Sequence, residues 1–250
     1  MDIAVLLIHG FGGTPQDLDL IKAELEKRGA EVEAPLLPGH GTCEADLQET
    51  GFKDWYRAVE ETYLHLGEKT KNVHAVGFSM GGTLALRLAQ MHSPASVTCI
   101  AAPVYLYSLF PPQATDWGVI TVPLLRFLHP YHPMHPPNPT SREIAPSTGY
   151  CEYQPMHAIH SFIRGLRLVR RNLSRVKAPL LLLQSPQDKT VLFRNAWKIA
   201  SRVSSDRRRM EIMNIRDLSG SPHMLPTHRE TKDRVRRMTA DFIFSAHHEG

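Results

Sequence analysis

Long hydrophobic runs are missing from this 250-residue sequence, so it offers no candidate membrane-spanning segment. The amino end has no basic stretch followed by an apolar stretch and a small-residue cleavage site, and we therefore expect no secretion signal. Cysteine is scarce, with three residues and no metal-ligand spacing. These absences argue against an integral membrane protein or a disulfide framework, and they favour a reduced, cytoplasmic protein.

The sequence also lacks a large excess of charge of either sign. It has 29 Lys and Arg and 25 Asp and Glu, which gives a net charge of +4. Two arginine-rich runs, Arg207–Arg209 and Arg234–Arg237, are candidates for a basic patch. No aromatic residues lie among them as stacking platforms for bases. We interpret the runs as solvated edges of a strand and a helix, and we predict no nucleic-acid partner. The sequence predicts no particular oligomeric state.

What the sequence does contain is a set of short apolar runs typical of buried strands. Most are continuous rather than alternating, as expected when helices cover both faces of a parallel sheet. The predicted strands are Ile3–Ile8, Glu31–Ala34, Val73–Gly77, Val97–Ala101, Leu180–Gln184 and Met210–Ile215.

Helical patterns separate most of these strands. The first is predicted to begin with Thr14 as N-cap and Pro15 at the first helical position, and Gly29 ends it. The others are about Lys53–Leu66, Met80–Met91, Phe193–Val203 and His228–Phe244. Alternating strands and helices predict an α/β protein with a mostly parallel, doubly wound sheet.

The middle of the chain departs from this alternation. Of the 19 prolines, 11 lie between Pro103 and Pro155. The stretch is too long for an ordinary loop and too rich in proline for a core segment. We predict that residues 1–102 and 173–250 form the α/β core, and that residues 103–172 form an inserted cap over the carboxyl ends of the strands.

The strongest local pattern is Gly77-Phe78-Ser79-Met80-Gly81-Gly82, which follows a predicted strand and opens a predicted helix. A serine hydroxyl is a weak nucleophile unless a base removes its proton. A sharp strand-to-helix turn makes the serine protrude, and it requires glycines two residues away on either side because side chains there would collide. We therefore predict that Ser79 is a nucleophile, beside a helix N-terminus that favours developing negative charge.

A glycine-rich loop, His9-Gly10-Phe11-Gly12-Gly13, follows the first predicted strand. Its glycines allow the backbone to approach a ligand closely. The backbone N–H of Phe11, together with that of Met80, would supply the two donors of an oxyanion hole for acyl transfer. We interpret His9, and His40 in the Pro-Gly-His-Gly turn, as structural histidines.

An acid that orients a catalytic base is expected in a loop at the carboxyl end of a strand. Asp188 is in this position, just past the predicted strand Leu180–Gln184. Asp206, in an arginine-rich stretch, and Asp217, close in sequence to the candidate base, are weaker alternatives.

The candidate base is His223, which lies after the last predicted strand and before the last predicted helix. A histidine can accept the Ser79 proton and return it to a leaving group. Asp188 would hold its tautomer and stabilise the imidazolium. His228 is the nearest alternative base. The chain order serine, aspartate, histidine agrees with the order known for one class of serine hydrolases.

These motifs together resemble the bacterial carboxylesterase and monoacylglycerol lipase group of α/β-hydrolases. The resemblance rests on Leu7-Ile8-His9-Gly10-Phe11-Gly12-Gly13, Leu37-Pro38-Gly39-His40-Gly41, the Ser79 segment, Ala178-Pro179-Leu180 leading to Asp188, and the segment before His223. It implies the α/β-hydrolase fold, a Ser79–Asp188–His223 triad and Phe11 and Met80 as oxyanion donors. The sequence differs from the group where Ser221 and Pro222 precede the histidine, and in a proline- and histidine-rich cap.

The function predicted from these residues is hydrolysis of carboxylic esters through an acyl-enzyme, without a cofactor. Small to medium acyl esters, including monoacylglycerols, are the expected small-molecule substrates. A thioesterase or a carbon–carbon bond hydrolase on the same triad remains open, and so does a small-molecule receptor that uses the fold without catalysis.

Two groups of cap residues also admit more than one interpretation. Five histidines recur in the cap, but intervening prolines prevent a regular helix and no carboxylate or cysteine joins them, so we prefer loop residues to a metal site. They are His129, His132, His135, His157 and His160. Nine apolar residues either pack the cap or line an acyl-chain channel. They are Tyr105, Tyr107, Leu109, Phe110, Trp117, Leu124, Leu125, Phe127 and Leu128.

Overall fold

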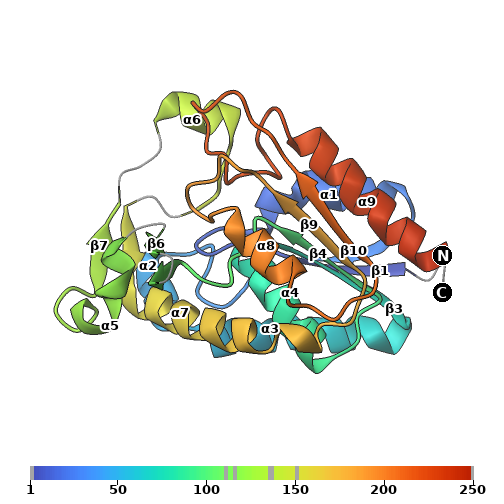
Figure 1. Ribbon diagram of the computed structural model, residues 1–250, viewed down its shortest axis with the longest axis horizontal. Coiled ribbons are helices and arrows are strands. Elements are labelled where there is room, and N and C mark those ends of the chain that lie inside the picture. The colour runs from blue at the N-terminus through green and yellow to red at the C-terminus, as the bar shows by residue number, and fades with distance from the viewer. Residues whose placement is uncertain (1–2, 110–111, 115–116, 135–137, 150–151, 249–250) are drawn as a thin grey trace.

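A six-stranded sheet with parallel neighbours lies at the centre of the computed structural model, which describes residues 3–109, 112–114, 117–134, 138–149 and 152–248 (Figure 1). The strand order is β10-β9-β4-β3-β1-β2. The strands are β1 (Ile3–Ile8), β2 (Glu31–Glu33), β3 (Asn72–Phe78), β4 (Ser96–Ile100), β9 (Leu180–Gln184) and β10 (Arg208–Ile212). Because β1 and β3 are parallel and Ile8 lies beside Gly77, the loops that follow them leave the sheet at the same edge.

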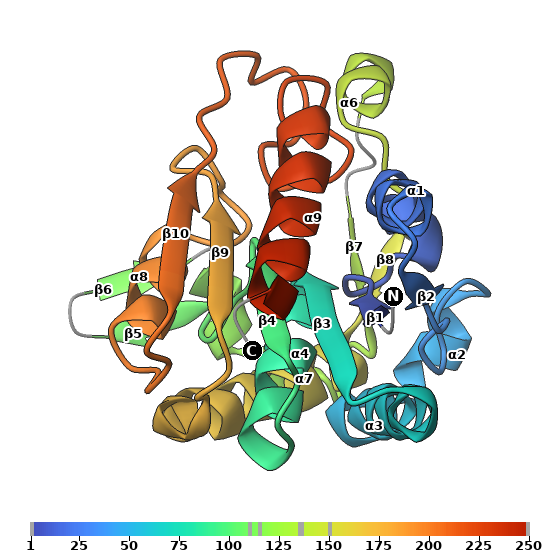
Figure 2. The same cartoon turned by 90° about the vertical axis from the view of Figure 1, so that its right-hand side faces the viewer.

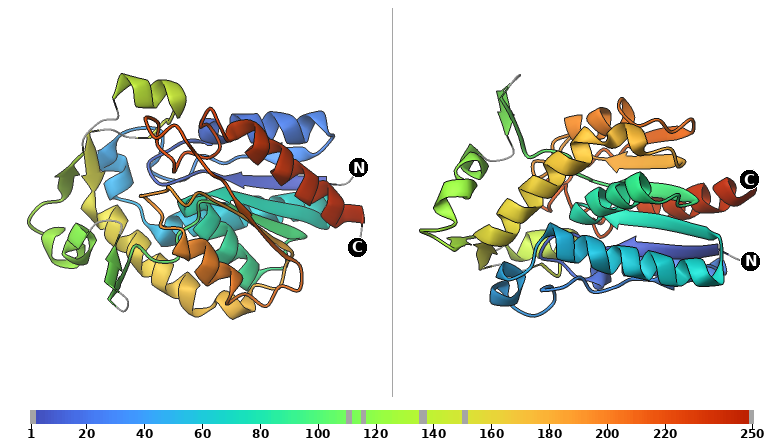
Figure 3. Two further views of the ribbon diagram at one scale, coloured as in Figure 1. Left: turned by 45° about the horizontal axis from the view of Figure 1, so that its top comes forward. Right: turned by 90° about the horizontal axis from the view of Figure 1, so that it is seen from below.

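Helices cover both faces of this sheet (Figures 2 and 3). Alternate side chains of β1 enter two separate apolar cores, one shared with α1 and α9 and the other with α3, α4 and α8. A strand buried on both faces needs apolar residues at every position, which explains the continuous runs. The predicted doubly wound α/β fold is confirmed. These helices are α1 (Asp19–Lys27), α3 (Phe52–Lys69), α4 (Met80–Met91), α8 (Arg194–Ala200) and α9 (Lys232–His248).

The segment between β4 and β9 contains smaller elements and one long helix. Its strands form two antiparallel pairs, β5 with β6 and β7 with β8. The elements are β5 (Tyr107–Leu109), β6 (Pro112–Ala114), η2 (Trp117–Ile120), α5 (Val122–Leu125), β7 (Tyr131–Pro133), α6 (Pro139–Ile144), β8 (Tyr153–Pro155), α7 (Met156–Arg171) and η3 (Leu173–Arg175). A further short helix, α2 (Glu44–Gln48), follows β2.

Helix α7 was not predicted from the sequence. It begins directly after Pro155, and its residues Ala158, Phe162, Leu166 and Val169 are buried in the same core as α3 and α4. These four positions recur at helical spacing. The proline-rich region therefore ends where a packed helix begins, and α7 joins the inserted segment to the core.

The predicted bounds of the last strand were wrong. Strand β10 begins at Arg208 and ends at Ile212, whereas the apolar pattern predicted Met210–Ile215. Met213 and Ile215 are buried, but they lie in the loop after the strand. Within the described part of the chain, β10 pairs with another strand on one side only. The arginines can belong to it because an edge strand accepts exposed charged residues.

The starts of two helices also differ from the prediction. Pro15 begins a 3-10 helix, η1 (Pro15–Leu18), and α1 follows it. Thr14 is the N-cap residue of η1, but its hydroxyl contacts the Gln16 and Thr148 side chains and caps no backbone N–H. The last helix, α9, begins at Lys232 rather than at His228.

The arginines of the two runs are exposed or half-buried, and several of them form ion pairs. Arg209 and Arg234 both pair with Glu211, at 2.8 and 3.0 Å, and Arg236 pairs with Glu24 at 2.7 Å. Carboxylates of β10 itself and of α1 thus balance Arg209, Arg234 and Arg236. This arrangement agrees with the interpretation of both runs as solvated edges.

Two further features concern the cysteines and the helix lengths. Cys43 is exposed and Cys99 is buried, and both are free thiols, whereas Cys151 lies outside the described residues. In the part of the chain that the structure describes, no helix combines the length and apolarity needed to cross a membrane.

Candidate active site

Ser79 lies in a strained turn between β3 and α4. Its φ of 53° and ψ of −120° are unusual for a residue with a side chain. Two backbone hydrogen bonds hold the turn. The Ser79 N–H donates to the Ile100 carbonyl at 2.8 Å, and the Gly82 N–H donates to the Ser79 carbonyl at 2.9 Å. Backbone strain of this kind persists only where the surroundings hold it, and it is concentrated at functional sites.

The glycines on either side of Ser79 are required by close backbone contacts. A Cβ atom on Gly77 would lie 2.1 Å from the Gly81 carbonyl oxygen, and one on Gly81 would lie 2.0 Å from the Ile8 carbonyl oxygen. These distances are far shorter than any real contact of a Cβ atom. The sequence pattern around Ser79 is therefore the pattern that this turn demands.

Hydrogen bonds connect Ser79, His223 and Asp188 in a continuous chain. His223 Nε2 is 2.9 Å from Ser79 Oγ, and His223 Nδ1 is 2.8 Å from Asp188 Oδ2. Asp188 and His223 are both buried. The three residues come from loops at the carboxyl ends of β3, β9 and β10, so the parallel sheet brings distant parts of the chain to one edge.

Asp188 is held by hydrogen bonds besides the one from His223. Its Oδ1 accepts the N–H groups of Thr190 at 2.8 Å and Val191 at 2.9 Å. Its Oδ2 accepts Gln184 Nε2 at 3.0 Å, and the same amide donates to the Val191 carbonyl at 2.9 Å. The carboxylate is thus fixed with one oxygen toward the imidazole.

Gln184 was overlooked in the sequence analysis. It is a buried amide at the end of β9, and it links the strand to the loop that carries Asp188. The signal was available, since Gln184 is the only polar residue in the run Leu180–Gln184. A polar side chain at the end of a buried apolar strand usually has a hydrogen-bonding role.

The glycine-rich loop after β1 passes directly against Ser79. A Cβ atom on Gly10 would lie 3.3 Å from Ser79 Cβ, so the backbone next to Phe11 approaches the serine closely. Among the described residues, the backbone N–H groups of Phe11 and Met80 have no acceptor. Both amides therefore remain available to a ligand.

His9 and His40 have structural hydrogen bonds. His9 Nε2 accepts the Leu37 N–H at 3.0 Å, so its Nδ1 carries the proton and donates to the Gly10 carbonyl at 2.9 Å. Burial, with a smaller contribution from His40, lowers the pKa of His9 to about 3. Burial also lowers the pKa of His40 to about 4. Neutral His9 thus ties the glycine-rich loop to the segment after β2.

The alternative acids and base lie away from this chain of hydrogen bonds. Asp206 is exposed, and Asp217 pairs with Arg229 at 2.6 Å. His228 is buried, but its Nδ1 accepts the Glu230 N–H and its Nε2 donates to the Asp217 carbonyl. Both nitrogens of His228 are thereby used within its own loop.

The cap histidines do not come together around a common point. Within the described ranges, no three His, Cys, Asp or Glu side chains form a metal-binding group. His160 instead accepts a hydrogen bond from Arg126 at 2.8 Å, while His129 and His132 are exposed. His135 lies outside the described residues.

The apolar residues of the cap differ in how far they are buried. Tyr105 and Leu125 are half-buried, and the latter packs on an apolar cluster with Phe11. Leu124, Phe127 and Leu128 are 70%, 73% and 70% exposed, so these three neither pack the cap nor line a channel in this structure. Phe110 lies outside the described residues, and so do the side chains of Leu109 and Trp117.

Comparison with known proteins decides the family. The model of the alpha/beta hydrolase family matches residues 5–236. The chain belongs to the alpha/beta hydrolase family. It is 32% identical over 216 residues to a thermostable monoacylglycerol lipase of Bacillus sp. (strain H-257), which covers 86% of this chain and 81% of that protein. It is 26% identical over 211 residues to a carboxylesterase of Bacillus subtilis (strain 168), with 84% and 82% covered.

Solved structures show the same fold for this α/β-hydrolase. A structure from work on the metagenome-derived lipolytic enzymes LipS and LipT matches with a TM-score of 0.81 at 24% identity, covering 98% of this chain and 94% of that chain. A monoacylglycerol lipase of Paleococcus ferrophilus matches with a TM-score of 0.77 at 16% identity, covering 97% and 94%. The predicted resemblance to the carboxylesterase and monoacylglycerol lipase group is confirmed.

Proposed function

We propose that this α/β-hydrolase cleaves carboxylic esters through an acyl-enzyme formed on Ser79. The observation that supports this proposal is the hydrogen-bond chain from Asp188 through His223 to Ser79, with distances of 2.8 and 2.9 Å. The names of the two Bacillus relatives, a monoacylglycerol lipase and a carboxylesterase, support an ester as substrate.

The first half of the reaction forms the acyl-enzyme. Because Asp188 accepts the Nδ1–H of neutral His223, the Nε2 lone pair faces the Ser79 hydroxyl. Nε2 takes the hydroxyl proton as Ser79 Oγ attacks the ester carbonyl. The tetrahedral intermediate then collapses, the bond to the alcohol oxygen breaks, and the imidazolium returns the proton to the leaving alcohol.

The second half releases the acid. A water molecule loses a proton to His223 Nε2 and attacks the acyl carbonyl, and Ser79 leaves with the proton that His223 returns. In both halves, the N–H groups of Phe11 and Met80 bind the oxyanion. One such donor contributes roughly 10²- to 10³-fold in rate. The N-terminus of α4 adds its positive dipole end at Met80.

The substrates we propose are esters with short to medium acyl chains, including monoacylglycerols. Residues 103–172 would cover the carboxyl ends of the strands as a cap on a core of residues 1–102 and 173–250. The reaction requires no cofactor. A reduced, cytoplasmic setting remains our prediction from the low cysteine content, and the absence of a nucleic-acid partner remains a prediction from charge.

Labelling with a fluorophosphonate probe tests the nucleophile. We expect the wild-type protein to form a covalent adduct and the Ser79→Ala variant to form none. Ser221→Ala is a matched control, because this serine lies two residues before His223 and its side chain has no hydrogen bond among the described residues. Equal labelling of wild type and Ser79→Ala would exclude an enzyme that uses this serine.

Turnover of matched substrates tests the ester class. We expect faster hydrolysis of an oxygen ester than of the thioester with the same acyl group, across a series of chain lengths that includes monoacylglycerols. A preference for the thioester would replace our proposal with a thioesterase. Labelling at Ser79 without turnover of any ester would favour a carbon–carbon bond hydrolase or a receptor.

A further inference from the structure

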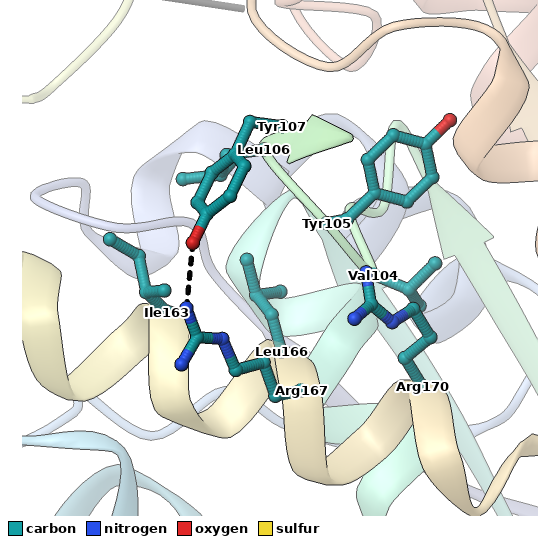
Figure 4. A pocket seen from close by; sticks show the side chains of 8 residues that line it. All are labelled: Val104, Tyr105, Leu106, Tyr107, Ile163, Leu166, Arg167 and Arg170. Atoms are coloured by element: carbon teal, nitrogen blue, oxygen red, sulfur yellow. Dashed lines mark hydrogen bonds between the residues drawn. The ribbon is translucent and has the colours of Figure 1, made fainter. Parts of the chain in front are cut away.

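A groove lies between the chain segment after β4 and helix α7 (Figure 4). Its volume is about 270 Å³. The segment contributes Val104, Tyr105, Leu106 and Tyr107, and α7 contributes Ile163, Leu166, Arg167 and Arg170. No residue of the proposed catalytic chain lines it. The groove is therefore distinct from the Ser79 site.

The groove is apolar at its base and cationic at its rim. Val104, Ile163 and Leu166 are buried, whereas Arg170 is half-buried and Arg167 is exposed. The backbone of the opposite wall is fixed, because Asn195 Oδ1 accepts the N–H groups of Val104 and Tyr105 at 2.8 and 3.0 Å. A preformed apolar cavity with a few polar groups at its mouth is a common form of ligand site.

The two arginines at the rim have no carboxylate partner among the described residues. Arg167 donates to the Tyr107 hydroxyl at 2.6 Å, a neutral acceptor (Figure 4). Helix α7 itself contains no Asp or Glu. Arginines elsewhere, such as Arg28, Arg234 and Arg236, form ion pairs. The positive charge at this groove is therefore left for a ligand to balance.

The surroundings of Tyr105 agree with this local charge. Burial raises the pKa of the Tyr105 phenol, and the nearby cations Arg194 and Arg170 oppose that rise. Arg170 thus acts electrostatically at the end of the groove where Tyr105 lies. An anion at the rim would be attracted by the guanidinium groups of both Arg167 and Arg170.

We propose that this groove binds an amphiphile that has an apolar chain and a single anionic head group. The chain would lie against Leu106, Ile163 and Leu166, and the head group would meet Arg167 and Arg170. Guanidinium groups bind carboxylates and phosphates through paired, charge-assisted hydrogen bonds. A dry cavity of about 150 Å³ binds benzene, so a groove of about 270 Å³ has room for a chain of roughly eight carbons.

This site would lie close to the proposed oxyanion loop without being part of it. Ile163 belongs to the small apolar cluster on which both Phe11 and Leu106 pack. Binding at the groove nevertheless needs no chemistry at Ser79. The inference therefore goes beyond the proposed ester hydrolysis and can be tested without it.

Calorimetric titration of the Ser79→Ala variant with four eight-carbon probes tests the proposal. Octanoate and octyl phosphate present the two head groups that arginine binds, 1-octanol has no charge, and octyltrimethylammonium has the opposite charge. We expect the two anions to bind at least tenfold more tightly than the other probes. The tighter anion identifies the head group.

Substitutions at the rim locate the binding site. In the Ser79→Ala background, the Arg167→Gln and Arg170→Gln double substitution is expected to weaken binding of both anions by about tenfold or more, because hydrogen bonds to charged groups are lost. Arg171→Gln is the matched control on the same helix, since Arg171 is exposed and does not line the groove. Thermal melting checks that both variants remain folded.

Two results would overturn the proposal. One is equal affinity for octanoate, 1-octanol and octyltrimethylammonium, which would mean that charge has no role. The other is unchanged anion binding in the folded double variant, which would place the anion elsewhere, including at the Ser79 site. Neither result depends on whether Ser79 is a nucleophile, so the proposed function could fail while this inference holds, or the reverse.

Discussion

The carboxyl edge of the central sheet and the segment between β4 and β9 follow different structural rules. At the sheet edge, Ser79, Asp188 and His223 are held by backbone contacts and hydrogen bonds that leave almost no freedom. In the inserted segment, short elements surround one long helix, and Leu124 and Phe127 are largely exposed. A site that needs fixed geometry is built on the sheet, whereas the segment beside it leaves large apolar side chains in solvent.

The largest expected effect is at the sheet edge, in the Asp188→Asn variant. An asparagine amide would donate to His223 rather than accept from it, so Nε2 would carry the proton and could not take one from Ser79. We expect kcat for ester hydrolysis to fall by about 10⁴-fold. We also expect the free energy of unfolding to fall by about 1–3 kcal/mol, because an amide NH2 in place of one carboxylate oxygen leaves a buried donor of Gln184, or of the Thr190 and Val191 backbone, without its acceptor. Steady-state kinetics on a p-nitrophenyl ester, together with thermal melting, measures both quantities.

Asp206→Asn is the control for that variant, because Asp206 is exposed and far from the hydrogen-bond chain. It is expected to retain wild-type kcat. Similar activity in the Asp188 and Asp206 variants would remove Asp188 from the proposed triad.

Two glycine-to-alanine substitutions compare a tightly packed backbone position with an open one. In Gly81→Ala, the new Cβ would lie 2.0 Å from the Ile8 carbonyl oxygen, so the turn must deform. We expect the free energy of unfolding to fall by about 3 kcal/mol or more. Gly67→Ala in α3 has open space around the new Cβ, and we expect a gain of roughly 0.5–1 kcal/mol because alanine favours the helix. Urea denaturation gives both values.

The two substitutions are expected to change the free energy of unfolding in opposite directions. If Gly81→Ala were as stable as the wild-type protein, the close packing of the turn against β1 would be wrong.

Within the inserted segment, one helix belongs to the core and another does not. Leu166 in α7 is 2% exposed, and Leu166→Ala is expected to reduce the free energy of unfolding by about 2–5 kcal/mol through the cavity it leaves. Leu124 in α5 is exposed, and Leu124→Ala should change stability by no more than about 0.5 kcal/mol. Chemical denaturation of the pair measures the difference, and equal losses would contradict the exposed position of α5.

The smallest expected effect is a change in the slope of stability against pH. The folded pKa of His9 is lowered to about 3, so below the ordinary pKa near 6.5 the unfolded chain binds a proton that the folded chain does not. Stability therefore falls as pH drops from about 6.5 toward 3, by about 1.4 kcal/mol per pH unit for this residue. His40, lowered to about 4, contributes in the same direction.

Denaturation between pH 7.5 and 5 measures this slope. His9→Gln should remove the contribution of His9 and flatten the curve below pH 6.5, whereas the exposed His132 in the inserted segment provides the control variant His132→Gln. A curve for His9→Gln that runs parallel to the wild-type curve would show that His9 is not buried in its neutral form.

Much of the sheet edge was predictable from the sequence because local constraints leave recognisable patterns there. The glycines around Ser79 are demanded by backbone contacts, and Asp188 and His223 follow strands whose carboxyl ends converge. The geometry now brings these three residues together, and their catalytic roles await the tests above. The role of Gln184 was overlooked, although a polar residue at the end of an apolar strand indicates a hydrogen-bonding role.

The inserted segment was less predictable because its signals are mixed. Helix α7 begins one residue after the last proline of a proline-rich stretch, and its arginines obscure an apolar spacing that is visible at Ala158, Phe162 and Leu166. The predicted bounds of β10 were shifted toward the carboxyl end for a related reason, since the arginines of the strand are exposed and buried apolar residues follow it. In both places, tertiary position outweighs local composition.

The arginines of β10 have a consequence for the behaviour of the protein at high concentration. Arg208 and Arg209 are exposed on the last strand of the sheet, where no other strand of the described residues pairs with the backbone N–H and C=O groups on one side. Another copy that added a strand along this side would have to remove water from these charged side chains. The charged side chains thereby discourage strand addition, and the open side of the sheet is protected from aggregation without being covered.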